Sequence, residues 1–474
     1  MRQGPAALGR TFQAGPGSNI SGSSGLSLSL TAPPPRSSSL SAQALAAVLP
    51  SGYPASVDPS YAAYSLWSAA ATLFASTAGV LATQSLLFAL GVGAGVALPA
   101  SAAWTWVCKD GLGQLGGVIY AAALGDRFDS DPKRWRFASA VAGDVAGALE
   151  VSLALSPAAL PFLPIAALAN VGRNVAWLSA SATKAGLHQA LATHGNLADV
   201  TAKAGSQVTA AATLGTAAGI LLSPLLGGDP TALALFFGSL SLAHVSCVTL
   251  SLRAVALPTL SDARLRLACG GLAQLPSAAA LTYTYLTPMA VRALERFLPG
   301  QGGADALAKT LPAAARVAVE IAPHLESVPD FAVFAQACGF LDLRHSSSSS
   351  RYVLVLGAPL SSSDGGLSYV RAQLLFATDA TWKDMLKGHL HALRAAAVLQ
   401  GVAAGEGVGV GVGVSEACAH ADVNYRAQIV REAIEWVGSV APGHLIALES
   451  AGWWVNTPLL ERGSEAATRR VEVI

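Results

Sequence analysis

Residues 230–252 read PTALALFFGSLSLAHVSCVTLSL and contain no Asp, Glu, Lys or Arg. On a helix this stretch is apolar on every side, and His244 is its only side chain that titrates near neutral pH. A helix needs about 20 apolar residues to cross a bilayer, whereas a surface helix of a soluble domain shows a charged face. The stretch therefore predicts a membrane-spanning helix, and this sets the expected class of fold.

Four further windows without a formal charge support this interpretation: residues 59–108, 151–172, 204–228 and 267–291. Placing an ionised side chain in hydrocarbon costs at least about 2.5–3.5 kcal/mol, so a bilayer selects long charge-free runs. Charged residues make up only 12% of the 474, against about 25% in an ordinary soluble protein. The mean hydropathy is +0.48. The alternative is a soluble, alanine-rich helical domain, because alanine raises the hydropathy without requiring lipid.

The first 48 residues have the composition of a targeting segment. No Asp or Glu occurs before Asp58, while three arginines and many serines do. Arginine and serine without acids are typical of an organelle transit peptide, and the serine content favours a plastid over a mitochondrion. The alternative is a plain disordered tail of Ser, Gly and Pro. We expect residues 1–48 to be disordered in either case.

The chain changes character near residue 293, where charges return. Residues 351–356 and 370–376 have the β-branched and apolar pattern of strands. A helix is expected from a cap at Thr378 or Asp379 to about Gln400, and a second over 422–438. Residues 453–455 resemble a last strand, and the Ser and Gly-Val runs at 346–350 and 405–414 resemble loops. We predict a small α+β domain over 293–474, facing water.

Several runs in the order found here resemble the root UVB sensitive family. The runs are residues 49–50 (LP), 52–57 (GYPASV), 79–84 (GVLATQ), 106–113 (WVCKDGLG), 125–136 (GDRFDSDPKRWR), 196–203 (NLADVTAK) and 205–207 (GSQ). The resemblance covers about residues 49–290. It implies apolar helices, a plastid or membrane association, and a link to ultraviolet-B responses, auxin transport and vitamin B6 balance. It also implies a protein partner, including another member of the family, but supplies no catalytic residue.

Asp144 and Glu150 lie inside an otherwise apolar run and are candidates for a polar pathway. Ionisable groups within a membrane helix face the bundle interior and mark functional sites. Arg173 and Lys184 are their expected partners. If the domain is soluble, the same residues are ordinary surface charges.

Lys133, Arg134 and Arg136 form a short basic run beside Trp135. Basic residues at a membrane surface bind anionic headgroups, so these three are candidates for contact with membrane lipid. The alternative is an ion-paired loop, because Asp126, Asp129 and Asp131 precede them.

Other motifs give weaker evidence for function. Residues 111–116 (GLGQLG) match GxGxxG, but no buried strand precedes them, so a close helix contact competes with dinucleotide binding. Residues 143–147 and 215–219 match GxxxG, which allows close helix packing. Asn196 with Asp199 resembles a helix cap. We identify no catalytic residue, metal site or cofactor, and the net charge of +1 gives no reason to bind nucleic acid.

The sequence thus predicts a mainly α, membrane-embedded domain over 49–292, followed by the α+β domain. The leading hypothesis is a non-enzymatic membrane protein, acting as a scaffold or in small-molecule transport or homeostasis. A polar-solute transporter using Asp144, Glu150 and Arg173 is the second hypothesis. A soluble nucleotide- or vitamin-binding enzyme using residues 111–116 is the third.

Overall fold

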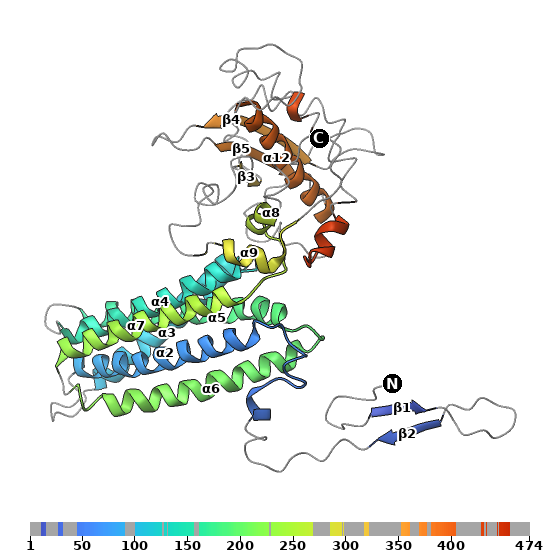
Figure 1. Cartoon of the computed structure of the whole chain (residues 1–474). Helices are drawn as coiled ribbons and strands as arrows, with labels where there is room; N and C mark the ends of the chain where they lie inside the picture. Colours follow the sequence, from blue (N-terminus) through green and yellow to red (C-terminus); the bar gives the residue numbers. More distant parts are fainter. Residues whose placement is uncertain are drawn as a thin grey trace.

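The structure is a computed structural model of the whole chain (Figure 1). It describes residues 11–15, 27–31, 45–90, 100–125, 128–129, 131–155, 161–226, 229–268, 285–295, 297, 317–321, 352–360, 369–376, 381–403, 428–430, 433, 443 and 445–455.

Long helices form the first large unit, and they lie side by side as a bundle (Figure 1). They are α2 (Tyr61–Ala89), α3 (Ala100–Leu124), α4 (Pro132–Leu155), α5 (Phe162–Leu191), α6 (Leu197–Leu222) and α7 (Pro230–Ala254). Helix α2 packs on α4, α6 and α7, while α5 packs on α3 and α4. The predicted multi-helix domain is confirmed.

The charge-free windows correspond to helices to different degrees. Window 230–252 lies within α7, which Asp229 caps by accepting a hydrogen bond from Thr231 N at 2.9 Å. Window 59–108 holds α2 and the first turns of α3, and most of window 204–228 lies in α6. Window 151–172 is instead divided between α4 and α5, and much of window 267–291 falls outside the described residues.

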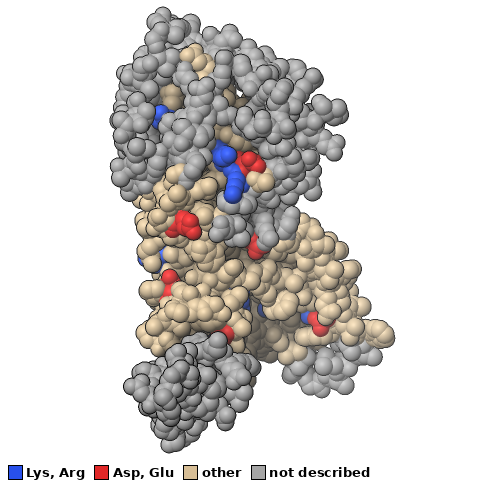
Figure 2. Space-filling view, turned by 90° about the vertical axis from the view of Figure 1, so that its right-hand side faces the viewer, with Lys and Arg blue, Asp and Glu red and all other residues tan. Residues whose placement is uncertain are grey.

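Three of the described helices, α2, α4 and α7, are long and apolar enough to cross a membrane. The bundle also presents large apolar side chains on its outside, including Trp104, Trp177, Leu221, Leu235 and Leu242. On the face shown in Figure 2, charged side chains of the described residues appear only in small, separate groups among uncharged ones. An apolar exterior of this kind is what contact with lipid requires.

Glycines allow α6 to approach α2 closely. A Cβ on Gly219 would lie 2.7 Å from Cβ of Val80, and one on Gly215 would lie 2.9 Å from Cβ of Ser76. The absence of these side chains also lets Thr77 Oγ1 donate a hydrogen bond to Gly215 O at 2.9 Å. The GxxxG pattern at 215–219 is therefore a packing contact.

The amino-terminal segment contains regular structure where we expected disorder. Strands β1 (Thr11–Gly15) and β2 (Ser27–Thr31) pair antiparallel, with Thr11 opposite Thr31. The sequence SLSLT of β2 alternates small polar and apolar residues, which is the period of a strand. The rest of residues 1–44 lies outside the described part.

The carboxyl-terminal unit is an α+β domain, as predicted. Strands β3 (Val317–Ile321), β4 (Tyr352–Leu360) and β5 (Tyr369–Phe376) form a sheet in the order β3-β5-β4. Strand β5 is parallel to β3 and antiparallel to β4. Helix α12 (Trp382–Ala403) packs on all three strands. The predicted strands at 351–356 and 370–376 are thus confirmed as β4 and β5.

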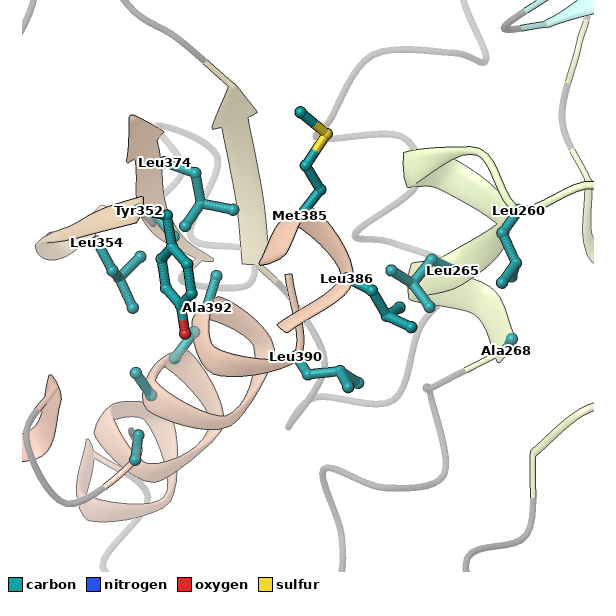
Figure 3. Packing of buried hydrophobic residues seen from close by; sticks show 14 of the residues in the cluster. Leu260, Leu265, Ala268, Tyr352, Leu354, Leu374, Met385, Leu386, Leu390 and Ala392 are labelled. Atoms are coloured by element: carbon teal, nitrogen blue, oxygen red, sulfur yellow. The ribbon is translucent and has the colours of Figure 1, made fainter. Parts of the chain in front are cut away.

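The core of this domain lies between the sheet and α12 (Figure 3). Met385, Leu386 and Leu390 of α12 are buried there with Tyr352 and Leu374. The core also includes Leu260, Leu265 and Ala268, from the segment that holds α8 (Asp262–Ala268). A short helix, α9 (Pro288–Leu294), spans the predicted boundary between residues 292 and 293, and its Val291 is buried in the same core.

Other predictions for this domain differ from the structure. Helix α12 begins at Trp382, and Thr381 Oγ1 donates to Asp384 Oδ2 at 2.6 Å, while Thr378 and Asp379 lie outside the described residues. The predicted last strand at 453–455 is a single bridge between Trp454 and Thr259. Most of the predicted helix at 422–438 and both low-complexity runs lie outside the described residues.

Candidate functional site

A cavity of about 420 Å³ opens at one end of the bundle, where five helices converge. It is lined by the start of α2 (Tyr64, Ser65, Ser68, Ala69, Thr72), the start of α4 (Arg136), the end of α5 (Ser181, Lys184, Ala185, His188), the start of α6 (Leu197, Thr201, Ala204, Gly205, Gln207, Val208) and the end of α7 (Ser251, Leu252). Its volume is that of a pocket for a small molecule.

Apolar and hydroxyl side chains make up most of the lining, and its charged side chains are basic. Arg136 and Lys184 come from different helices, and none of the residues that line the cavity is Asp or Glu. Arg136 Nη1 donates to Ser139 Oγ at 3.1 Å. Lys184 has no hydrogen-bond acceptor or ion-pair partner among the described residues. The cavity therefore holds positive charge that the described part of the chain does not neutralise.

His188 and Lys184 are both affected by burial. Burial and then the charge of Lys184 lower the pKa of His188 to about 4, so its ring is neutral at pH 7. Burial and then the charge of Arg136 lower the pKa of Lys184. His188 Nδ1 lies 3.2 Å from Thr201 Oγ1, so one ring nitrogen has a hydroxyl partner.

Residues of α6 form hydrogen bonds with the segment that precedes α2, beside the cavity. Gln207 Nε2 donates to Val48 O at 2.7 Å and to Tyr61 Oη at 3.1 Å. Ser51 N donates to Asp199 Oδ2 at 2.7 Å. Two groups of family-like residues, 49–57 and 196–207, thus contact each other.

Asn196 does not act as the side-chain cap that we predicted. It occupies the N-cap position of α6, but its side chain makes no capping hydrogen bond. Its Nδ2 instead donates to Ser56 O at 3.0 Å. A tertiary contact with the preceding segment has replaced the local one.

The predicted headgroup residues Lys133, Arg134 and Arg136 are not brought together. Lys133 is buried and forms an ion pair with Glu295. Arg134 is exposed and pairs with Asp131 at 3.3 Å, which agrees with the ion-paired alternative. Arg136 lines the cavity. Successive positions on a helix point in different directions, and this separates the three side chains.

The predicted polar pathway consists of two separate contacts, an ion pair and a carboxylate–histidine contact. Glu150 is buried and accepts from Arg173 Nε at 2.9 Å, between α4 and α5. Asp144 lies 3.0 Å from His244 Nδ1, between α4 and α7. Asp144 is eight residues from Arg136 along α4, about 12 Å at the rise of an α-helix. Sequence reasoning missed His244 as the partner of Asp144, although it was the one group titrating near neutral pH in its window.

The GxGxxG run forms no phosphate-binding turn. Gly111, Gly113 and Gly116 lie in the middle of α3. A Cβ on Gly116 would lie 2.8 Å from Val171 Cγ1, and one on Gly113 would overlap Asn170, both on α5. A Rossmann loop needs amides at a helix start. Gly113 and Gly116 therefore form a helix contact, and the hypothesis of an enzyme that uses this run as a nucleotide loop is wrong.

No group of three or more His, Cys, Asp or Glu side chains that could hold a metal ion occurs among the described residues. Cys108 is exposed and Cys247 is buried, and both are free thiols.

Comparison with known proteins identifies similar chains. The family profile described as the vitamin B6 photo-protection and homoeostasis domain matches residues 34–274. Protein root UVB sensitive 3 of Arabidopsis thaliana is 34% identical over 255 residues, which cover 51% of this chain and 58% of that protein.

Two further relatives show the same pattern. Protein root UVB sensitive 2, chloroplastic, of the same plant is 36% identical over 45% of this chain and 48% of its own. RUS family member 1 of Dictyostelium discoideum is 33% identical over 46% of this chain and 41% of its own. The chain thus spans about half the length of these curated relatives. No solved structure matches it.

Proposed function

The chain belongs to the root UVB sensitive family, and on this basis we propose that it is a membrane-associated, non-enzymatic protein that holds a small polar solute in the cavity and serves vitamin B6 homeostasis. The single observation that carries the proposal is the cavity itself, a chamber whose wall combines apolar, hydroxyl and basic side chains, at one end of a bundle with an apolar exterior. The link to vitamin B6 in this proposal comes from the description of the family.

Binding fits the lining better than catalysis does. The cavity offers hydroxyls and cations, which orient a solute, and a His188–Thr201 contact. A nucleophile and base acting together need a third group that orients the base, commonly a carboxylate. None of the lining residues is Asp or Glu.

The proposed location is a plastid membrane, with a mitochondrial or other organelle membrane as the alternative. The apolar helices α2, α4 and α7 support the proposal of a membrane location. A relative named as chloroplastic supports the proposal of a plastid. Membrane lipid and a second root UVB sensitive protein are the proposed partners.

Alkaline carbonate extraction tests the membrane part. We expect the full chain to stay in the membrane pellet and to be released only by detergent. A full chain released by carbonate, and monodisperse without detergent, would overturn it. Mass spectrometry of B6 vitamers in cells lacking the chain tests the homeostasis part: pools unchanged by its removal and return would contradict it.

A transporter for a polar solute is the second candidate, favoured by the Asp144–His244 and Glu150–Arg173 pairs in the bundle. Paired ionisable groups between membrane helices occur along transport pathways. Solute uptake by vesicles reconstituted with the full chain tests this: Asp144→Asn should abolish uptake while leaving the protein folded. Glu449→Gln, in an exposed position of the other domain, is the control. Unchanged uptake in Asp144→Asn would reject this pathway.

A further inference from the structure

We propose that the cavity binds a phosphate monoester, with the phosphate group between Arg136 and Lys184. This inference rests on the proposed function, because it assumes that the cavity holds a solute, and it adds the chemical class of that solute.

The first argument is the unbalanced charge of the site. Among the other buried or half-buried cations of the described bundle and its junction, four have carboxylate partners: Lys109, Lys133, Arg173 and Arg264. Lys203 and Arg292 donate instead to the main-chain oxygens of Ala46 and Ala254. In the described residues, Arg136 donates to the neutral hydroxyl of Ser139, and Lys184 has neither a carboxylate nor a carbonyl partner. Removing cations from water without a counter-ion is unfavourable, so an anion is the missing component.

The second argument is the amount of charge. His188 is neutral at pH 7, because burial lowers its pKa to about 4, so the cationic side chains of the cavity are Arg136 and Lys184, which bring two positive charges when both are protonated. A phosphate monoester carries about −1.5 to −2 at this pH, which balances both. A single carboxylate would leave one cation unbalanced.

The third argument is the remainder of the lining. Hydroxyls of Ser65, Ser68 and Thr201 can contact phosphate oxygens, because hydroxyls both donate and accept hydrogen bonds. Ala69, Ala185 and Leu252 provide apolar wall for an organic group. The volume of about 420 Å³ exceeds what a phosphate ion alone would fill. The site therefore fits an organic phosphate rather than the inorganic ion.

The position of the cavity favours a soluble ligand. It lies among the first turns of α2, α4 and α6 and the last turns of α5 and α7, at one end of the bundle. A phosphate there avoids the hydrocarbon centre, where a charge is most costly. A lipid bearing a phosphate monoester would offer the same chemistry at this level, so the experiment must separate the two sources.

The test compares an organic phosphate with the same molecule lacking the phosphate and with phosphate alone. Binding of pyridoxine 5′-phosphate, pyridoxine and inorganic phosphate is measured by calorimetry on the full chain, purified in detergent without phospholipid. We expect pyridoxine 5′-phosphate to bind at least tenfold more tightly than either of the others. None of the three probes carries an aldehyde, so random imine formation with surface lysines cannot imitate binding.

Variants locate the site. Lys184→Gln and Arg136→Gln should each weaken binding of pyridoxine 5′-phosphate at least tenfold, and Lys184→Arg should retain most of it. Arg253→Gln is the matched control, because Arg253 is exposed, next to Leu252, and does not line the cavity. The rescue by arginine separates loss of charge from loss of folding.

The outcomes are distinct. Equal binding of pyridoxine and its phosphate, unaffected by Lys184→Gln, would overturn the inference and leave the proposed solute-binding function standing. If none of the probes binds, the proposal that the ligand is a soluble phosphate monoester is overturned. If phosphatidic acid in nanodiscs then binds, and Lys184→Gln abolishes it, the phosphate monoester is upheld with a lipid as its source. If phosphatidic acid also fails, the inference fails.

Discussion

Lys133, at the start of α4, forms a buried ion pair with Glu295, which directly follows α9. Arg264 Nε also donates to Glu295, at 2.8 Å. Burial opposes ionisation of Glu295, but the two cations outweigh it and hold its pKa below the usual value. This carboxylate therefore fastens the bundle to the segment that leads into the carboxyl-terminal domain.

We predict that Glu295→Gln destabilises the protein by about 3–5 kcal/mol, because it leaves two buried cations without a counter-ion. The measurement is the thermal unfolding transition of the full chain in detergent. Glu449→Gln is the control, since Glu449 is exposed, and its transition should be unchanged. Equal transitions for both variants would show that Glu295 does not hold the junction.

His391 predicts a loss of stability in mild acid. Its ring is buried in α12, Nε2 lies 2.8 Å from Val430 O, and Nδ1 has no hydrogen-bond partner within the described part of the chain. Burial outweighs the Val430 carbonyl and lowers the pKa of His391 to about 4. The unfolded ring, with a pKa of about 6.5, binds a proton before the folded one does. Stability should thus be greatest above about pH 6.5, fall as pH decreases toward 4, and change no further through this residue below that.

Unfolding temperatures at pH 7.5 and pH 4.5 check this in the wild type and in His391→Gln. His188 and other buried groups contribute in both proteins. The variant should therefore lose less stability than the wild type over the same interval. An identical pH dependence in the two proteins would contradict the assignment to His391.

Much of the fold could be predicted from local sequence. The charge-free run at 230–252 gave α7 nearly to the residue, because Asp229 caps one end and Arg253 lies at the other. Strands β4 and β5 followed from β-branched and apolar patterns. Each of these elements depends on neighbours within a few residues, which a sequence displays directly.

The candidate site could not be predicted in the same way. Arg136 and Lys184 are 48 positions apart, and the cavity draws on five helices, so no spacing along the chain marks it. Asp144 and Glu150 could be identified as acids in an apolar run, but only one of their two partners could be predicted. Arg173 was near in sequence, whereas His244 lies 100 positions from Asp144. The packing of α7 against α4 creates that pair, and packing is a property of the whole bundle.

The close approach of α6 to α2 gives a prediction for Gly219. A Cβ there would lie 2.7 Å from Cβ of Val80 and 3.1 Å from Thr77 O, so Gly219→Ala must force the helices apart. We expect a loss of about 1–3 kcal/mol, typical of overpacking. Gly238→Ala on α7 is the matched control, because nothing lies within 4 Å of its Cβ. The control should gain up to about 1 kcal/mol from helix propensity, and thermal unfolding in detergent would reveal opposite signs.

The Glu150–Arg173 pair predicts strong coupling between two helices. The Glu150 side chain is 3% exposed and that of Arg173 is 35% exposed. Removing Arg173 leaves a buried carboxylate alone, so Arg173→Gln should cost up to about 3–5 kcal/mol. The double variant Glu150→Gln with Arg173→Gln should be more stable than Arg173→Gln alone, because neither charge remains.

A double-mutant cycle on unfolding free energies measures this coupling. Asp131 and Arg134 supply the control cycle, since their side chains are 34% and 46% exposed and lie 3.3 Å apart. This pair is more exposed than Glu150, and water screens such pairs to about 0–1 kcal/mol, so the control coupling should be smaller than that of Glu150 and Arg173. Equal couplings in the two cycles would mean that the environment of Glu150 screens charge as water does. The Glu150–Arg173 pair between α4 and α5 would then not be part of a buried pathway through the bundle.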